Sequence, residues 1–246
     1  AVPATPLREH LYTLYVGTRN GGVWKTTNNG VTFEPIFDGQ PRLYIGDVAV
    51  APSDANIVWV GTGEAYCARS STSGDGVYKS ADAGKTWANM GLRDSEHIAR
   101  IVIHPKNPDV VYVAAMGHLF STNAERGVFR TDDGGKTWRK VLYVNEKIVA
   151  VDLAMVLGEP DTLYAAMYDK VRLPWHYELG GPESAIYKTT DGGKTWARLG
   201  GGLPAGRIGR IGEPGNLRQH PHPGTRLDQS SVVCRALVLA SIQDDA

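Results

Sequence analysis

An eight-residue segment recurs four times along this chain with nearly the same letters, and this repeat constrains the fold more than any other feature. The first residues of successive copies lie 54, 51 and 58 positions apart. A period of this size is typical of a repeat architecture in which each unit buries its apolar face against the next. The copies are TTNNGVTF (Thr26–Phe33), SADAGKTW (Ser80–Trp87), TDDGGKTW (Thr131–Trp138) and TTDGGKTW (Thr189–Trp196).

The residues around each copy predict four short strands, named A to D in chain order. In the second and third units an alternating strand A leads through a Pro-containing turn into an apolar strand B, which is typical of a hairpin. Strand C precedes the eight residues and strand D follows them. Four antiparallel strands every ~50 residues indicate the blade of a β-propeller, so we predict an all-β propeller with about four such blades. The B strands are Thr13–Thr18, Ile57–Thr62, Val110–Ala115 and Thr162–Met167.

The eight residues form the turn between strands C and D. Asp82, Asp133 and Asp191 are expected to accept hydrogen bonds from backbone N–H groups two residues on, with Asn28 in their place in the first copy. The fifth position is always Gly, and the last is Phe or Trp, which can bury a ring between sheets. This pattern is that of the Asp-box, also called the bacterial neuraminidase repeat. We predict a structural role for the aspartates, because a catalytic residue is not needed once per blade.

The repeat occupies residues 11–212, and residues 213–246 form a C-terminal tail without the blade pattern. The first twelve residues do not resemble an inner strand A, so the first unit is expected to supply only strands B, C and D. One alternative is that Arg207–Gly212 pairs with the first unit and closes the ring; the apolar run Ser231–Ser241 is another source of that strand or of a packing helix. Otherwise open blade edges remain, which favours association of copies.

Composition excludes several classes of function. Lys plus Arg and Asp plus Glu both number 26 among 246 residues, so no basic surplus indicates a nucleic-acid partner. No apolar run approaches the ~20 residues of a membrane span. Cys67 and Cys234 match no metal-ligand or redox spacing, and the sequence does not decide whether they form a disulfide. We predict no metal and no cofactor, and expect either a processed secreted or periplasmic protein or a fragment.

Candidate functional residues lie on the B–C loops, which a propeller places on one face around its axis. Three of the four loops are longer than a turn needs: 63–76, 117–127 and 168–184, beside the short 19–22. Glycosidases need two carboxyl groups, ~5 Å apart for retention or ~6.5–9.5 Å for inversion. The candidate catalytic carboxylates are Glu64, Glu125 and Asp169, with Asp75 as a further member of the set. The candidate substrate-binding residues are Arg19, Tyr66, His118, Arg126, Arg172, Trp175 and His176.

Each of these residues also has a structural interpretation. Glu64 follows strand B directly and could cap a turn, and His118 could pack at the rim. Asp75 lies in a Ser-Gly-Asp-Gly turn signal, and Trp175 could hold its own loop. The D–A connections add Asp47, Asp94, Glu96 and His97 near the same face, while His104 lies in an A–B turn and is expected to be structural.

The stretch from about Leu14 to Arg210 resembles large bacterial repeat proteins described as glycosyl-hydrolase-like or sortilin-like. The carrying segments include YVGTRNGGVWKTTNNG, IGDVAVAPSDANIVWVGTGE and ERGVFRTDDGGKTWRKVLYVNE. The resemblance implies a propeller that generally has seven blades, so this chain would be a fragment or a smaller ring. The same repeat occurs in sialidases, xyloglucan-cleaving endoglucanases, the sortilin luminal domain and photosystem assembly factors. The Phe/Tyr-Arg-Ile-Pro motif of true sialidases has no match here.

Two functions from different classes follow. The first is a carbohydrate-active hydrolase, glycosidase-like, with a carboxylate pair on the B–C loop face and a carbohydrate or glycoconjugate as substrate. The second is a non-catalytic propeller that binds a peptide, protein or glycan, as the resemblance to sortilin implies. An esterase or lactonase on the same scaffold is a third hypothesis, since fold alone does not decide function.

Overall fold

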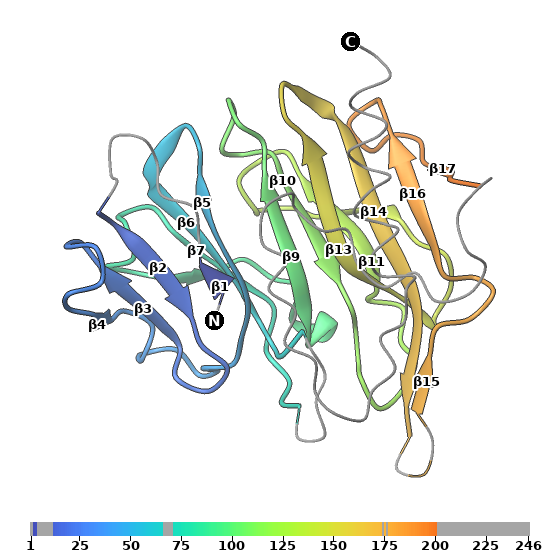
Figure 1. Cartoon of the computed structure of the whole chain (residues 1–246), viewed down its shortest axis with the longest axis horizontal. Helices are drawn as coiled ribbons and strands as arrows, with labels where there is room; N and C mark the ends of the chain where they lie inside the picture. The colour runs from blue at the N-terminus through green and yellow to red at the C-terminus, as the bar shows by residue number, and fades with distance from the viewer. Residues whose placement is uncertain (1, 4–11, 66–70, 174, 176, 201–246) are drawn as a thin grey trace.

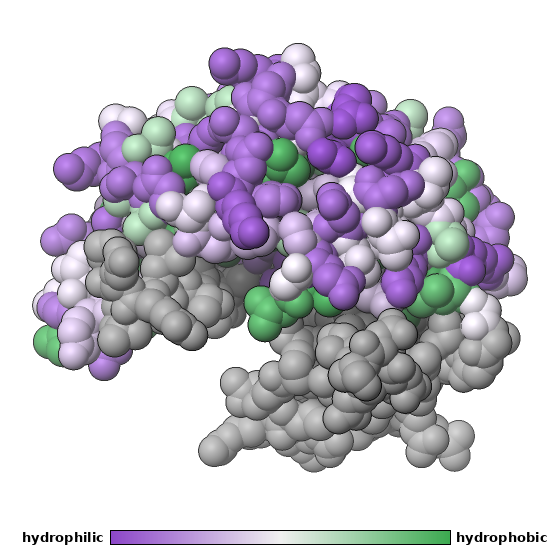
Figure 2. All heavy atoms as spheres, turned by 90° about the horizontal axis from the view of Figure 1, so that it is seen from above, coloured by the Kyte–Doolittle hydropathy of each residue, from purple (hydrophilic) through white to green (hydrophobic). Residues whose placement is uncertain are grey.

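The computed structural model describes residues 2–3, 12–65, 71–173, 175 and 177–200, and these residues fold into four antiparallel sheets that follow one another along the chain (Figure 1). Viewed at right angles to Figure 1, they form an arch with a mostly hydrophilic outer surface (Figure 2). Each sheet is one predicted blade, with strands paired in chain order. The propeller architecture is therefore confirmed, and in the described residues no strand of the first sheet pairs with the fourth.

The strands have the following bounds. The first sheet holds β1 (Val2–Pro3), β2 (Leu14–Gly17), β3 (Val23–Thr26) and β4 (Glu34–Pro35), and the second holds β5 (Ile45–Ala51), β6 (Asp54–Thr62), β7 (Val77–Ser80) and β8 (Ala88–Asn89). The third holds β9 (Ile98–Ile103), β10 (Val111–Ala115), β11 (Gly127–Thr131) and β12 (Arg139–Leu142). The fourth holds β13 (Ile148–Val156), β14 (Glu159–Arg172), β16 (Ala185–Thr189) and β17 (Ala197–Arg198), and β15 (Tyr177–Leu179) pairs with β14. A single 3₁₀ turn, η1 (Arg93–Ser95), precedes β9.

The N-terminal residues correct one expectation. Val2 pairs with Gly17 and Pro3 with Val16, so β1 supplies a short inner strand that we expected the first unit to lack. The proline prevented its recognition, because Pro is found in sheets only at edges and at strand starts. β1 also occupies the edge of β2 that the ring-closing pairing of residues 207–212 would use. Those residues, the apolar run 231–241 and the tail 213–246 lie outside the described part of the chain.

Apolar cores fill the gaps between neighbouring sheets. Tyr15, Phe37 and Val48 belong to the core between the first and second sheets, and Trp59 with Ile98 to the next one. Side chains alternate between the two faces of a strand. One face of a sheet therefore packs against the preceding sheet and the other against the following sheet. Gly46 shows how closely the inner strands approach, because a Cβ atom there would lie 1.9 Å from the carbonyl oxygen of Ile98.

The Asp-box turns have the same internal hydrogen bonds in the second, third and fourth copies. In the second copy, Asp82 Oδ1 accepts the backbone N–H of Thr86 at 2.9 Å, and its Oδ2 accepts the Thr86 hydroxyl at 2.6 Å. Ser80 donates its hydroxyl to Asp82 and accepts the N–H of Gly84 at 2.8 Å. The structural role of the aspartates is confirmed. We expected each aspartate to accept the backbone N–H two residues later, and this is wrong. In the second copy that N–H, of Gly84, donates to the Ser80 hydroxyl, and Asp82 instead accepts from Thr86, four residues later.

Each of these three turns also docks on the preceding blade. The carbonyl at the fourth position of the box accepts a hydrogen bond from a cation on strand C, and that cation lies 5.3–5.4 Å over the centre of an aromatic ring on strand B. Where the ring belongs to Tyr, its hydroxyl donates to the same carbonyl. The rings are Tyr15, Trp59 and Tyr112, the cations are Lys25, Lys79 and Arg130, and the carbonyls belong to Ala83, Gly134 and Gly192.

The ring that ends the box completes this junction. Trp87 donates its indole N–H to the carbonyl of Ile36, and Trp138 donates to the carbonyl of Met90, both at 2.7 Å. The accepting residues lie on the D side of the preceding blade. The second, third and fourth boxes therefore fix their own turns and also hold their blades against the blade before. Among the described residues, the indole N–H of Trp196 in the fourth box has no such acceptor.

Candidate functional site

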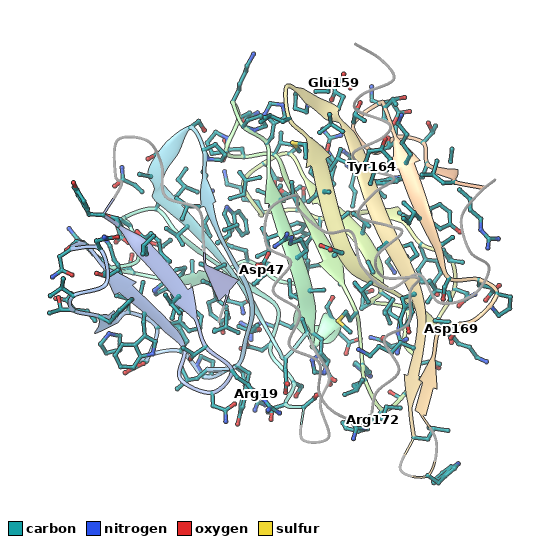
Figure 3. The ribbon with its side chains drawn as sticks, in the orientation of Figure 1. Arg19, Asp47, Glu159, Tyr164, Asp169 and Arg172 are labelled. Atoms are coloured by element: carbon teal, nitrogen blue, oxygen red, sulfur yellow. The ribbon has the colours of Figure 1, made fainter. Side chains whose placement is uncertain are left out.

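The described parts of the four B–C connections lie together at one end of the arch, at the bottom of Figure 1, as predicted. Arg19, Asp169 and Arg172 lie toward this end, whereas Glu159 and Tyr164 lie toward the other (Figure 3). The fourth connection is a hairpin arm rather than an irregular loop, because β14 runs on to Arg172 and pairs there with β15. Trp175 at the end of this arm is 81% exposed, so it does not hold its own loop in place.

Glu64 and Arg19 join the loops of the first two blades. The Arg19 Nε atom lies 3.1 Å from Glu64 Oε1, and the Arg19 side chain is 49% exposed while that of Glu64 is 8% exposed. The backbone of Glu64 is also engaged: its N–H donates to Thr72 at 3.2 Å, and its carbonyl lies 3.1 Å from His97 Nδ1. Because a carbonyl only accepts, His97 carries its proton on Nδ1. This arrangement places a buried carboxylate directly behind an arginine that faces solvent.

His97, which contacts Glu64, and His118 lie in different environments. His97 is buried, and its burial lowers the pKa of its imidazole to about 4, so the ring is neutral at pH 7. His118 lies at the surface, with Nε2 3.0 Å from Asp94 Oδ1 and 3.7 Å from Glu96 Oε1. Its Nδ1 lies 3.1 Å from the hydroxyl of Ser121. The acidic partners of His118 come from the D–A connection, and its role as a substrate-binding residue stays a prediction.

A recess lies between the two histidines and the fourth blade. It has no room for a water molecule and is therefore not a pocket that a ligand enters. One wall comes from the loop that follows β10, and the other from β13 and β14. The lining residues are His97, Met116, Gly117, His118, Leu119, Val149 and Lys170.

Arg126 is a structural residue of the third loop. Its side chain is fully buried, and its guanidinium donates to Asn123 Oδ1 and to the carbonyl of Lys147, both at 3.0 Å. Two further bonds reach the carbonyls of His118 and Ser121. Arg126 was predicted to bind substrate directly; with its donors committed to the loop, it can influence a ligand only through the loop that it shapes.

The three predicted catalytic carboxylates lie on the loops of three different blades. Glu125 is 3.8 Å from Lys140 of β12, which directs it toward the outer strand of its own blade. Asp169 lies at the base of the hairpin arm, where its N–H donates to the Ser184 hydroxyl at 2.9 Å and its carboxylate packs against Gly181. The N–H of Arg172 donates to the carbonyl of Leu119 at 3.2 Å, which ties the arm to the third loop.

Asp75 has the turn role that the sequence offered as an alternative. It accepts the Tyr78 hydroxyl at 2.7 Å, and its N–H donates to Thr62 at 2.8 Å. Tyr66, His176, Cys67 and Cys234 lie outside the described residues. Among those that are described, no group of three His, Cys, Asp or Glu side chains could hold a metal ion, and no helix is long and apolar enough to cross a membrane.

A charged cluster on the inner strands was not predicted. Arg100 of β9 lies between two buried carboxylates, with Nη1 3.9 Å from Asp47 Oδ1 of β5 and Nε 3.4 Å from Asp152 Oδ1 of β13. Each of these three inner strands has a register shift directly before its charged residue, and such bulges redirect side chains. Asp47 also accepts the N–H of Ile101 at 2.7 Å, and burial raises the pKa of its carboxyl to about 6.

The comparisons with known proteins agree with this architecture. A xyloglucanase of Hypocrea jecorina (strain QM6a) is 27% identical over 217 residues, which cover 76% of this chain and 24% of that protein. The solved GH74 enzyme of Niastella koreensis has 20% identity and a TM-score of 0.58, with 80% of this chain and 29% of that chain covered. The GH74 xyloglucanase from Xanthomonas campestris has 19% identity and a TM-score of 0.53, with 80% and 30% covered.

These structural likenesses show a shared fold, and the chain spans no more than about a quarter of the length of the curated relatives it matches. The model of one family, Sortilin-Vps10 (sortilin, neurotensin receptor 3), matches residues 75–203. This match covers more than half of the chain and contains three of its four blades in whole or in part. The chain therefore belongs to the Sortilin-Vps10 family.

Proposed function

We propose that the B–C loop face binds a carbohydrate chain and that the protein is a glycosidase-like hydrolase acting on polysaccharides of the xyloglucan class. The observation that carries this proposal is the Arg19–Glu64 pair, in which a buried carboxylate of the second blade stands behind a solvent-facing guanidinium of the first. The sequence similarity to xyloglucanases supports the choice of substrate. A secreted or periplasmic location would give the protein access to such a polymer.

In this proposal the loop residues have separate roles. Arg19 bonds to sugar hydroxyls at the surface, and the exposed Trp175 ring stacks on a sugar face. Glu64 and Asp169 are the two carboxyl groups that the hydrolysis of a glycosidic bond requires. The narrow recess between His118 and Lys170 leaves the polymer lying across the face rather than in a deep pocket.

A second candidate is binding without hydrolysis. Two of the three predicted carboxylates lie beside a cation, Glu64 beside Arg19 and Glu125 beside Lys140. Each ion pair engages the carboxylate within the protein, and a substrate would have to compete with the cation for it. Membership of the Sortilin-Vps10 family, which includes neurotensin receptor 3, favours a peptide, protein or glycan as the ligand.

The decisive experiment measures hydrolysis and binding on the same protein. The full chain is incubated with xyloglucan and its oligosaccharides, new reducing ends are counted, and affinity is measured by calorimetry. We expect Glu64→Gln and Asp169→Asn to lower turnover at least 100-fold while thermal unfolding stays cooperative. Glu125→Gln is the matched control, because its partner lies on the outer strand, and it should retain full turnover.

The outcomes separate the candidates. If xyloglucan or a peptide binds but no new reducing ends form, the hydrolase is rejected and the binding function is supported. Turnover that survives in Glu64→Gln and Asp169→Asn would show that these carboxyl groups are not the catalytic pair. Neither binding nor turnover on any glycan or peptide probe would reject both.

A further inference from the structure

An aspartate, a histidine and a serine form a hydrogen-bonded chain between the third B–C loop and the D–A connection before it. His118 Nε2 lies 3.0 Å from Asp94 Oδ1, and His118 Nδ1 lies 3.1 Å from the hydroxyl oxygen of Ser121. Glu96 Oε1, 3.7 Å from the same Nε2 atom, adds a second carboxylate on that side of the ring. A hydroxyl within reach of a base that a third group orients is the arrangement that activates serine for acyl transfer.

The carboxylates decide which nitrogen of His118 is the base. A carboxylate oxygen only accepts, so Nε2 carries the proton of the neutral ring and donates it to Asp94. Nδ1 then has a free lone pair and accepts the hydroxyl proton of Ser121. The ring is turned over relative to the best-known triads, in which Nδ1 faces the carboxylate. The roles of orienting acid, base and nucleophile are the same.

A network around the buried Arg126 holds these groups in place. The Arg126 guanidinium donates to the carbonyls of His118 and Ser121, so it fixes both ends of the segment that joins base and nucleophile. Asn123 Oδ1 accepts the N–H of His118 at 3.1 Å, and Asn123 Nδ2 donates to the carbonyl of Asp94 at 3.0 Å. The relative position of the three side chains is therefore set by the fold of the loop, as a catalytic site requires.

The surroundings of Ser121 favour an ester with a small acyl group. Ser121 and Phe120 are exposed, and the recess beside His118 has no room for a water molecule, so a long acyl chain finds no pocket. The alcohol part of the ester can extend into solvent and be large. In the described part of the chain, the N–H groups of Phe120 and Ser121 donate to no acceptor, which leaves them to bind the carbonyl oxygen of a substrate.

We propose that Ser121, His118 and Asp94 form a second hydrolytic site, which cleaves acetyl esters. The Ser121 oxygen attacks the ester carbonyl carbon, its proton passes to His118 Nδ1, and Asp94 stabilises the imidazolium. The bond from that carbon to the alcohol oxygen breaks, and the alcohol leaves with the proton from Nδ1. Water then gives a proton to Nδ1 and attacks the acetyl-serine; acetic acid is released, and Ser121 recovers its proton from His118.

This activity is separate from the proposed cleavage of glycosidic bonds. It uses neither Glu64 nor Asp169, and it breaks a carboxylic ester instead of a bond between sugars. Loss of ester hydrolysis therefore leaves the glycosidase proposal untouched, and a chain that releases no reducing ends from xyloglucan can still hydrolyse esters.

The hydrolysis of 4-nitrophenyl acetate by the full chain tests the site. We expect Ser121→Ala and His118→Gln each to lower turnover on the order of 100-fold, because nucleophile and base act together. Asp94→Ala should cost less, since Glu96 also faces Nε2. Thr122→Ala is the matched control: it removes an exposed hydroxyl next to the nucleophile and should keep full turnover. 4-Nitrophenyl octanoate should react more slowly than the acetate.

A covalent label distinguishes a serine nucleophile from the general reactivity of a surface histidine. A fluorophosphonate probe reacts with an activated serine hydroxyl, and mass spectrometry of the digested protein should find it on Ser121. His118→Gln should remove the label while thermal unfolding stays cooperative. Full ester hydrolysis by Ser121→Ala, or a folded native chain without label on Ser121, would overturn the proposal. Faster turnover of the octanoate would overturn the preference for acetyl.

Discussion

The hydroxyl of Tyr112 on β10 donates to the carbonyl of Gly192, 80 residues later in the chain, at 2.9 Å. Arg130 of β11 donates to the same carbonyl and lies over the Tyr112 ring at 5.3 Å. One backbone oxygen of the fourth blade thus receives two donors from the third. The equivalent oxygen of Ala83 receives two donors from the first blade, Tyr15 and Lys25. The contacts between blades therefore repeat along the chain, as the blades themselves do.

Removing the hydroxyl of Tyr112 tests the weight of this junction. Tyr112→Phe should lower the free energy of unfolding by about 1 kcal/mol, because one hydrogen bond is lost while Arg130 still satisfies the carbonyl of Gly192. Urea unfolding at constant m-value measures the change. Tyr143→Phe is the control, since the Tyr143 side chain is 40% exposed, and it should change stability little. Equal losses in the two variants would contradict a specific role for the junction.

A glycine of the third box gives a second test of the same interface. Gly135 has φ +96°, and a Cβ atom there would lie 2.6 Å from the Trp59 ring. Gly135→Ala combines a strained backbone with overpacking and should cost about 2–4 kcal/mol. Gly39 has no heavy atom within 4 Å of a Cβ position, so Gly39→Ala is the matched control in the same urea assay. A small effect at Gly135 would show that the blades separate more easily than the packing indicates.

The box residues and the long B–C loops could be predicted from the sequence because they repeat, and a repeat fixes both the strand order and the position of each turn. What could not be predicted depends on contacts between units. The ion pair of Arg19 with Glu64 joins two loops 45 positions apart, and the cluster of Asp47, Arg100 and Asp152 joins three inner strands. One feature of the sequence could have indicated this cluster: Asp47, Arg100 and Asp152 each interrupt an otherwise apolar inner strand near its start.

Other differences arise from short elements. A two-residue strand such as β1 has too few residues to show alternation, and β15 pairs only with an extension of β14 that has no counterpart in the other blades. Arg126 was predicted to bind substrate because an arginine in a long polar loop is usually exposed. Its burial follows from four acceptors in the chain around it, which no pattern in the sequence reveals.

The Asp-box carboxylates should make the protein acid-sensitive in a narrow range. Hydrogen bonds, chiefly from the Thr86 hydroxyl, lower the pKa of Asp82 from 3.8 to about 2. A depressed pKa means that the stabilisation is complete above pH ~4 and is lost as the pH falls toward 2. Asp82→Asn should keep the turn, as Asn28 does in the first box, and should flatten the loss of stability between pH 4 and 2. An unchanged acid profile, measured by urea unfolding at each pH, would show that this carboxylate does not couple to folding.

Asp47 and His97 should oppose each other between pH 4 and 6. Burial raises the pKa of Asp47 from 3.8 to about 6, so the folded state holds a proton that the unfolded state releases, and stability falls as the pH rises through this range. Burial lowers the pKa of His97 from 6.5 to about 4, so the unfolded state takes up the extra proton, and stability falls as the pH decreases. The two effects partly cancel in the native chain.

Separate variants should reveal each effect. In Asp47→Asn only the His97 contribution remains, so stability should rise with pH from 4 to 6, while the amide oxygen can still accept the N–H of Ile101. In His97→Gln only the Asp47 contribution remains, and stability should fall over the same range. Urea midpoints measured at intervals of half a pH unit compare the two slopes. Slopes of the same sign would contradict this prediction. They would mean that the pKa of at least one of the two groups is not shifted by burial between the unfolded and folded states.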